Sequence, residues 1–449
     1  MKCAVITPVG PGHAELFAQS CAPSVAQARS FGMGPFTEID HMMMDDTAGA
    51  HGRSNRRNEA LQQALAAGVD WVFFLDADDV MTPNAFAAFG EVLAGEPDLD
   101  AVWGLICTYN DAGDPELREG QPERIDSRQA LLSVMPALAI QIGAFVKTEA
   151  AAAIGFDAAM NTGEDFRFYY RLWAAYRCAK RPVIFFVNRR GQHSTGPRAA
   201  TGADWNESVT RQWAEQLAEV PVWAEIADGQ GAPAKMRLTN PRDLIQMAHM
   251  RGEFFEHDSL AKLKRLLTRD NPTIVEVGAN IGNHVVWYAR HLSPGKIYPV
   301  EPNPEALALL DQNIAANDIG DCVDRRGWGL GAGRGEGRFA AVTDDADNLG
   351  ATRLVEAEDG GIETKSIDVL MGRERVDFIK IDAEGMEMDV LDGAAGVIAR
   401  DGPVIWIEVL RPNMLDFVQD WCRRANYRVV DSTAYVNTVD YFAVPRASV

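Results

Sequence analysis

The amino-acid sequence predicts an α/β protein of two domains, each built on a mainly parallel sheet. First, apolar strand-like runs alternate with helical stretches rich in Ala and Leu in both halves. Second, 449 residues with 47% hydrophobic content suffice for two packed cores. Third, a polar stretch containing Gly and Pro lies near 226–240. We therefore expect an N-terminal domain at 1–228, a linker at 229–240 and a C-terminal domain at 241–449.

Composition narrows the classes of partner. The formal net charge of −21 offers no general basic surface for a phosphate backbone, so nucleic acid is not expected as a partner. The six cysteines are scattered without a C-x-x-C pair, which is typical of reduced thiols. No apolar run reaches membrane-spanning length, and the first ten residues lack the apolar region of a signal peptide. These features predict a soluble cytoplasmic protein and leave its oligomeric state open.

The first half opens with an apolar strand at 3–10, and a later strand at 71–79 ends in carboxylates. Asp76, Asp78 and Asp79 follow the apolar run, so we expect them at the carboxyl edge of the sheet, where α/β proteins bind ligands. Clustered carboxylates suit Mg²⁺ or Mn²⁺ bridging a diphosphate, because the metal neutralises charge that develops on the leaving group. The alternative is that Asp78 or Asp79 only caps a helix beginning near 82.

Several segments of this half occur in a recognisable order. They are TPVG (7–10), the Asp pair at 45–46, RRNEAL (56–61), LDADDVMTP (75–83), NTGEDFRFYYRLW (161–173) and QHS (192–194). Together they resemble glycosyltransferase family 2, which has the GT-A fold, over roughly residues 1–225. The resemblance implies metal-dependent, inverting sugar transfer from a nucleotide-sugar donor to a glycan or another hydroxyl-bearing acceptor.

The same resemblance implies roles for individual residues. The side chains that would contact the nucleotide-sugar are Thr7, Asp46, Arg57 and Asp76. Asp76 and Asp78 would hold the metal, and His193 would meet the metal or the diphosphate. For His193 a purely structural role is an equal alternative, because an isolated histidine is often a satisfied structural residue.

Two further carboxylates, Glu164 and Asp165, precede an aromatic helical stretch. By the resemblance, Asp165 would be the general base that deprotonates the acceptor hydroxyl, and Glu164 would lie beside it in the acceptor pocket. An inverting transfer needs a base on the sugar face opposite the leaving diphosphate, so base and metal come from separate segments. The alternative is that both carboxylates form a solvated helix N-terminus favoured by the helix dipole.

The second half contains a nucleotide-binding pattern, TIVEVGANIG at 273–282 followed by Glu301 in PVEPNP. It describes a strand, a glycine turn and a second strand ending in a carboxylate that can accept hydrogen bonds from both ribose hydroxyls. The dinucleotide fingerprint would need glycine at 280 and 283, where this chain has Asn280 and Asn283. The acidic-G-A-N-x-G form favours S-adenosylmethionine instead of NAD or FAD.

A third segment, 376–394, predicts a buried strand followed by a polar tip and a helix. Asp382 and Glu384 lie at this tip, where either can orient the acceptor hydroxyl or act as base. The structural alternative is that they cap the helix at 385–391. Glu408 ends a further apolar strand near the same cleft, and His284 receives no role from the sequence.

Five segments of this half, RGEFFE (251–256), GANIG (278–282), EPNP (301–304), IKIDAEG (379–385) and IEV (407–409), resemble the FkbM-type methyltransferases over roughly residues 240–445. The resemblance implies a class I, Rossmann-like fold and S-adenosylmethionine-dependent O-methylation of a hydroxyl. It assigns the cofactor to Glu276, Gly278, Asn280, Gly282 and Glu301, and catalysis to Asp382 and Glu384.

The two resemblances predict a bifunctional glycan-modifying enzyme, with methylation on the transferred sugar. One alternative is a methyltransferase whose GT-A-like domain only binds a glycan. Another is a scaffold in which neither pocket takes a ligand. The donor sugar, its nucleotide base, the acceptor and the methylated position stay open, because they depend on loops such as 108–135.

Overall fold

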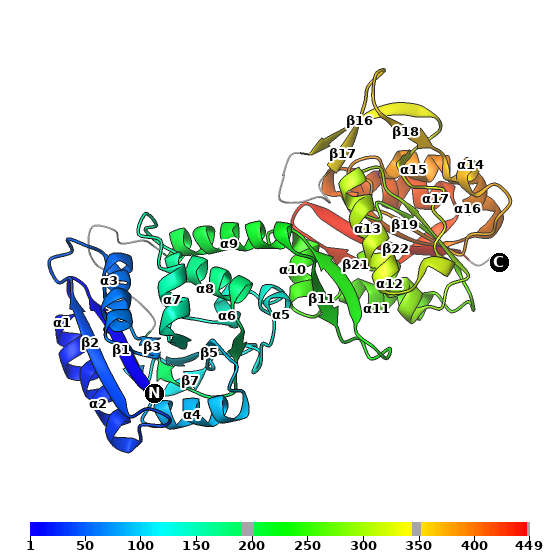
Figure 1. Cartoon of the computed structure of the whole chain (residues 1–449). Coiled ribbons are helices and arrows are strands. Elements are labelled where there is room, and N and C mark those ends of the chain that lie inside the picture. Colours follow the sequence, from blue (N-terminus) through cyan, green and yellow to red (C-terminus); the bar gives the residue numbers. More distant parts are fainter. Residues whose placement is uncertain (190–201, 344–351, 447–449) are drawn as a thin grey trace. The chain divides into compact units, whose positions relative to one another are not determined.

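The computed structural model describes residues 1–189, 202–343 and 352–446 (Figure 1). The chain divides into two compact units, Met1–Val222 and Trp223–Val449. Both have the α/β architecture that the sequence predicts. In the described part of the chain, we find no helix with the length and apolar character needed to cross a membrane.

The boundary between the units lies earlier than the sequence predicts. The expected linker at 229–240 contains strand β12 (Ala234–Leu238), which forms a two-stranded hairpin sheet with β11 (Val222–Ile226). Alternate side chains of β12 are buried, and Ala234 and Met236 pack into the core of the second unit. The Gly- and Pro-containing stretch is therefore the turn of this hairpin and not a linker.

The main sheet of the N-terminal unit has the order β2-β1-β3-β8-β5-β9. Its strands are β1 (Lys2–Val9), β2 (Glu38–Asp45), β3 (Trp71–Phe74), β5 (Ala101–Trp103), β8 (Ala144–Lys147) and β9 (Cys178–Lys180). β1 is parallel to β2 and β3, whereas β8 is antiparallel to both of its neighbours. The sheet is thus mixed, more so than the mainly parallel sheet expected. Short pairs join β4 (Val80–Met81) to β10 (Phe186–Val187) and β6 (Cys107–Tyr109) to β7 (Pro115–Leu117).

Helices cover both faces of this sheet. They are α1 (Ala14–Leu16), α2 (Ala22–Phe31), α3 (Arg53–Ala66), α4 (Ala85–Gly95), α5 (Arg128–Leu132), α6 (Pro136–Ala139), α7 (Thr148–Ile154), α8 (Glu164–Ala175) and α9 (Gly202–Glu219). α2 and α4 pack on one face through aromatic contacts such as Phe89 on Phe145, whose ring centroids are 4.2 Å apart. On the other face Phe168 of α8 meets Phe74 of β3. This packing fixes the first turn of α8 above the end of β3.

The main sheet of the C-terminal unit has the order β14-β13-β19-β20-β22-β21. Its strands are β13 (Thr273–Val277), β14 (Lys296–Val300), β19 (Phe378–Ile381), β20 (Val404–Leu410), β21 (Tyr427–Ala434) and β22 (Thr438–Pro445). β14, β13, β19 and β20 are parallel, and β22 is antiparallel to β20 and β21. A smaller sheet combines β15 (Leu330–Ala332), β18 (Ile362–Lys365), β16 (Gly337–Thr343) and β17 (Thr352–Glu356).

Two helical layers enclose this second sheet. The helices are α10 (Leu244–Met250), α11 (His257–Leu266), α12 (Asn283–His291), α13 (Pro304–Ala316), α14 (Ile367–Met371), α15 (Glu387–Gly393), α16 (Ala395–Asp401) and α17 (Cys422–Arg424). α11, α12 and α13 bury apolar side chains against one face, and α14, α15 and α16 cover the other. The arrangement leaves the carboxyl ends of β13, β14 and β19 at one edge, next to one another.

Candidate functional site

In the N-terminal unit, the carboxyl ends of β1, β2 and β3 bring Thr7, Asp46 and Asp76 to one edge. The chain leaves β1 for β2 on one side and reaches β3 on the other, which makes this a topological switch point. Thr7 is fully buried, and its hydroxyl lies 3.0 Å from His41 Nε2. Asp46 accepts hydrogen bonds from the backbone N–H groups of His51 and Gly52, at 2.9 and 2.7 Å. Both side chains thus stabilise this edge of the sheet through contacts within the unit.

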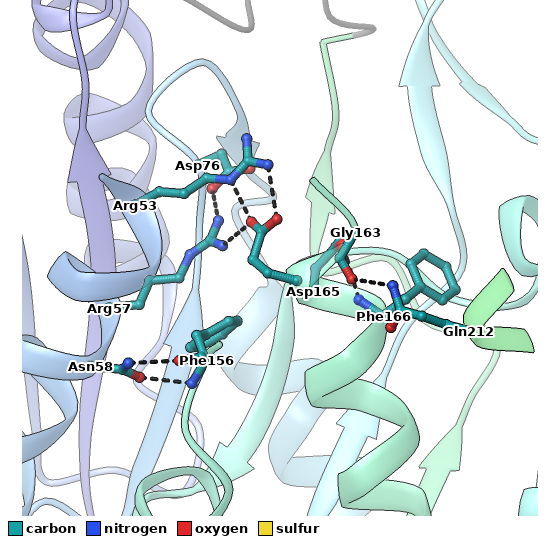
Figure 2. A network of polar contacts seen from close by, with 10 residues as sticks. Arg53, Arg57, Asn58, Asp76, Phe156, Gly163, Asp165, Phe166 and Gln212 are labelled. Atoms are coloured by element: carbon teal, nitrogen blue, oxygen red, sulfur yellow. Dashed lines mark hydrogen bonds and ion pairs between the residues drawn. The ribbon is translucent and has the colours of Figure 1, made fainter. Parts of the chain in front are cut away.

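A buried ion-pair network connects α3, β3 and α8 (Figure 2). Arg53 and Arg57 lie one turn apart on α3, and both donate to the Glu164 carboxylate at the start of α8. Arg57 also donates to Asp76 Oδ1 at 2.5 Å. The side chains of Arg57 and Glu164 are only 2% and 3% exposed. Glu164 is therefore a buried counter-ion of two guanidinium groups, and the interpretation as a solvated helix terminus is wrong for this residue.

The three carboxylates after β3 lie in different surroundings. Asp79 is fully buried and accepts hydrogen bonds from the Asn188 amide and the Arg189 backbone N–H. Burial and the neighbouring carboxylates of Asp76 and Asp78 raise its pKa well above the usual range. Asn84 precedes α4, so Asp79 does not cap that helix. Asp76 and Asp78 are partly exposed. Crowded oxygen donors of this kind fit Mn²⁺ or Mg²⁺, because a cation relieves their repulsion.

Asp165 follows Glu164 in the first turn of α8 and remains partly exposed. Its partial burial and the adjacent Glu164 carboxylate raise the pKa of Asp165 to about 6, although Arg53 and Arg57 oppose the shift. A carboxylate with a raised pKa is a stronger base than an ordinary one. His193, the remaining residue predicted for the metal, lies outside the described residues.

The C-terminal unit has a second switch point, where β13 lies between β14 and β19. A cavity opens at the carboxyl ends of these strands. Its lining includes Gly278, Asn280, Glu301, Asp382 and Glu384, together with Phe255, Glu256, His284, Lys380 and Leu354. Residues predicted separately for the cofactor and for catalysis thus meet at one cavity.

Glu301 directly follows β14 and is 6% exposed. Its two carboxylate oxygens accept hydrogen bonds from the backbone N–H groups of Asn280 and Asn303, each at 2.8 Å. These bonds fix the carboxylate at the cavity wall. Burial raises the pKa of Glu301 to about 7, against the effect of both N–H donors. Nearby, the side-chain oxygen of Asn280 is buried without a hydrogen-bond partner among the described residues. This polar wall fits the ribose of S-adenosylmethionine.

Gly278 and Gly282 allow the turn between β13 and α12, with φ of 79° and 84°. A Cβ at Gly278 would lie 1.9 Å from the carbonyl oxygen of Asp382, and one at Gly282 would lie 2.4 Å from the Leu310 side chain. Gly278 lines the cavity, whereas Gly282 supports the turn from behind. Close approach of β13 to β19 therefore requires glycine at 278.

Gly278→Ala is expected to destabilise the C-terminal unit by about 2–4 kcal/mol, since the positive φ and the backbone collision both add strain. The measurement is chemical denaturation followed by hydrogen exchange in peptides of each unit. Gly361→Ala is the matched control, because a Cβ there meets nothing within 4 Å. Equal stability of the two variants would contradict the explanation.

Comparisons with known proteins bear on this cavity. Residues 276–429 match the methyltransferase FkbM domain. The C-terminal unit contains an FkbM methyltransferase domain. The methyltransferase SdnD of Sordaria araneosa is 30% identical over 156 residues, which are 27% of this chain and 60% of that protein. The match thus spans less than two thirds of the length of this relative.

Solved structures similar to the chain include the following two. Methyltransferase FkbM from Methylobacillus flagellatus is 17% identical, with 62% of this chain and 71% of that chain covered and a TM-score of 0.31. Residues 1–349 of S. aureus TarS are 14% identical, with 81% and 100% covered and a TM-score of 0.37. The assignment of the FkbM domain rests on the matched residues 276–429 and not on these structures.

Within the FkbM domain, Glu276 is fully buried behind the cavity wall and holds a histidine. Its Oε1 lies 2.9 Å from His284 Nδ1, and His284 Nε2 lies 3.1 Å from Glu256 Oε2. Burial and Lys380 lower the pKa of His284, but bonds to Glu256 and Glu276 outweigh them and raise it. Glu276, predicted for the cofactor, is absent from the cavity lining, whereas His284, left without a role by the sequence, reaches it.

The tip after β19 carries the two predicted catalytic carboxylates. Asp382 accepts from the buried Lys380 ammonium at 3.0 Å. Burial and the Asp382 carboxylate raise the pKa of Glu384 to about 7. Met386 occupies the position before α15 and has no side-chain cap, and Gly385 N–H donates to Glu387. The helix thus begins too late for Asp382 or Glu384 to cap it.

The sequence also missed Asp440, a buried carboxylate of β22 in the C-terminal unit. Burial and the Glu256 carboxylate raise the pKa of Asp440 to about 7, and burial and Asp382 raise that of Glu408 to about 8. Strand alternation within 438–445 was the available signal, since Asp440 is a lone acid in an otherwise apolar run.

Proposed function

We propose that the C-terminal unit methylates a hydroxyl group with S-adenosylmethionine as donor. The observation that supports this most is the Glu301 carboxylate, fixed by two backbone N–H groups in the wall of the cavity. In this proposal Glu301 accepts hydrogen bonds from the ribose hydroxyls, and the unpartnered side-chain oxygen of Asn280 is a further acceptor for the cofactor. The bound cofactor supplies an activated methyl group.

The acceptor proton goes to a carboxylate at the tip of β19. Glu384 is the better base, because its pKa of about 7 matches neutral conditions. Asp382, paired with Lys380, orients the acceptor instead. Residue Glu384 also has a positive φ of 46°, an uncommon backbone conformation that points to a constrained role at the site.

We further propose that the N-terminal unit transfers a sugar from a nucleotide-sugar to an acceptor hydroxyl. The C-terminal unit then methylates a hydroxyl of the transferred sugar. Asp76 and Asp78 would hold Mn²⁺ or Mg²⁺, which would neutralise charge on the diphosphate. Asp165 would remove the acceptor proton. Linking the two units in one chain raises the effective concentration of the first product at the second site.

One observation favours a second candidate, a methyltransferase whose N-terminal unit only binds a glycan. Arg57 occupies one oxygen of Asp76 and competes with a metal for that carboxylate. Titration of the full chain with S-adenosylhomocysteine, and assays of nucleotide-sugar hydrolysis with Mn²⁺, separate the candidates. Binding plus hydrolysis supports the bifunctional enzyme, binding alone supports the second candidate, and absence of binding refutes both. Faster methylation of a glycosylated than of an unglycosylated acceptor would support the coupling.

Sugar transfer is expected to decline as pH falls below about 6, because protonation of Asp165 removes the base. Asp165→Asn should lower the turnover by about 10²–10⁴-fold and abolish this pH dependence. The measurement is turnover of the nucleotide-sugar against pH, with Asp157→Asn as the control on the same unit. A wild-type profile in Asp165→Asn would contradict the role of this residue.

A further inference from the structure

The register of β20 and β22 places two carboxylates face to face in the C-terminal unit. Glu408 and Asp440 are directly paired across the antiparallel strands. Like charges in that position destabilise a sheet unless something neutralises them. A pair of acids at such a position therefore calls for a proton or a cation between them.

A third carboxylate completes the group. Glu256 stands before the first turn of α11 with a φ of 58°, and its side chain is 8% exposed. One oxygen from each of Glu256, Glu408 and Asp440 lies within 4.8 Å of the others. That spacing suits three oxygens around one ion, since Ca²⁺ and Mg²⁺ bind oxygen at about 2.0–2.6 Å.

Asp440 provides a separate indication that a ligand is missing. It is 1% exposed, and neither of its oxygens has a hydrogen-bond partner among the described residues. The Trp406 indole lies near Asp440 and lowers its pKa, but outside hydrogen-bond geometry. A buried carboxylate without a partner costs free energy, so Asp440 needs a further group.

Nearby cations compensate only part of the charge. Lys380 bonds to Asp382 and also attracts Glu256, Glu276 and Asp440. His284 lies between Glu256 and Glu276. These two groups face the five carboxylates of Glu256, Glu276, Asp382, Glu408 and Asp440, which leaves the face with an excess of negative charge.

We propose that Glu256, Glu408 and Asp440 bind a divalent cation of the Mg²⁺ or Mn²⁺ class. Three carboxylates form a hard oxygen donor set, which selects such ions over softer metals. Glu256 also lines the cavity, so the ion lies beside it. The role of the ion rests on the methyltransferase proposal, and it is to hold hydroxyl oxygens of the acceptor.

The test counts bound Mn²⁺ by electron paramagnetic resonance, in the full chain carrying Asp76→Asn and Asp78→Asn. These changes remove the proposed metal ligands of the N-terminal unit. We expect one Mn²⁺ per chain in this background, and at least a 10-fold loss of Mn²⁺ affinity after Asp440→Asn or Glu408→Gln. The control Asp416→Asn removes one exposed charge of the same unit and should change nothing.

Titration with S-adenosylhomocysteine shows whether each variant is folded and separates the two proposals. Retained S-adenosylhomocysteine binding with lost Mn²⁺ binding supports the cation site. Absence of Mn²⁺ binding in the background, or full Mn²⁺ binding in Asp440→Asn, overturns it, and then the two acids share a proton. Mn²⁺ binding without S-adenosylhomocysteine binding would sustain the cation site and refute only the proposed methyltransferase.

Discussion

Glu164→Ala is expected to destabilise the N-terminal unit by about 3–5 kcal/mol, because it removes the buried carboxylate that two guanidinium groups share. Arg57 is only 2% exposed, and Arg53 lies against the same carboxylate. Asp76 bonds directly to Arg57 and attracts Arg53 without a direct bond. Glu164→Gln should also destabilise the unit, since the neutral amide keeps the shape but not the charge.

Hydrogen exchange under increasing denaturant measures this loss, with protection of β1 and β3 as the readout and protection of β13 and β19 as an internal reference. Glu59→Gln is the matched control. Glu59 pairs with Arg56 on the surface of α3, the helix that carries Arg53 and Arg57. The pair is 2.7 Å apart, and 49% of the Glu59 side chain is exposed. Such exposed pairs contribute about 0–1 kcal/mol. A loss after Glu164→Ala as small as that of the control would show that water or a neighbouring group already compensates both arginines.

The result also decides how the Asp76 carboxylate is positioned. If Glu164 is removed, Arg57 is free to draw more strongly on Asp76, and Mn²⁺ affinity should fall in whatever variant remains folded. Glu164 would then be a positioning residue, acting through the two arginines on the donor side of the site. That role differs from the acceptor-side role implied by the family resemblance.

The sequence predicted the features that short segments determine. Carboxylates directly after apolar strands lie at sheet edges, as expected for Asp76 and Glu301, because a strand that leaves the core must place its next polar residue at the rim. The role of Gly278 in the turn was equally predictable, since a strand-to-helix turn of this type needs a positive φ. The α/β class and the two units follow from the same local patterns.

The contacts that depend on tertiary packing and strand pairing could not be predicted from the sequence. Arg53 and Glu164 are 111 positions apart, and only the packing of α8 on the sheet brings them together. Asp440 faces Glu408 because β22 inserts antiparallel beside β20, which no local pattern specifies. The family resemblance assigns Glu276 to the cofactor, but strand alternation turns this side chain toward His284.

Glu301→Ala is expected to weaken binding of S-adenosylhomocysteine by at least about 100-fold. Two hydrogen bonds from ribose hydroxyls to one carboxylate contribute about 1.5–3 kcal/mol each. Isothermal titration of the full chain measures the loss. Glu305→Ala is the matched control, because Glu305 is an exposed acid four positions further along in the first turn of α13. Unchanged affinity in Glu301→Ala would refute the assignment of the ribose to this carboxylate.

The raised pKa of Glu301 permits a sharper form of the same test. The ligand-free carboxyl has a pKa of about 7, so at pH 7 a large fraction is protonated. Ribose hydroxyls donate to the ionised form, so binding lowers this pKa and releases protons. Titrations at pH 7 in buffers of different ionisation enthalpy should therefore reveal proton release, and affinity should fall as pH drops below about 7. Glu301→Ala should lose both effects, whereas Gly278→Ala, which strains the turn but keeps the Glu301 carboxylate, should weaken binding and retain the proton release.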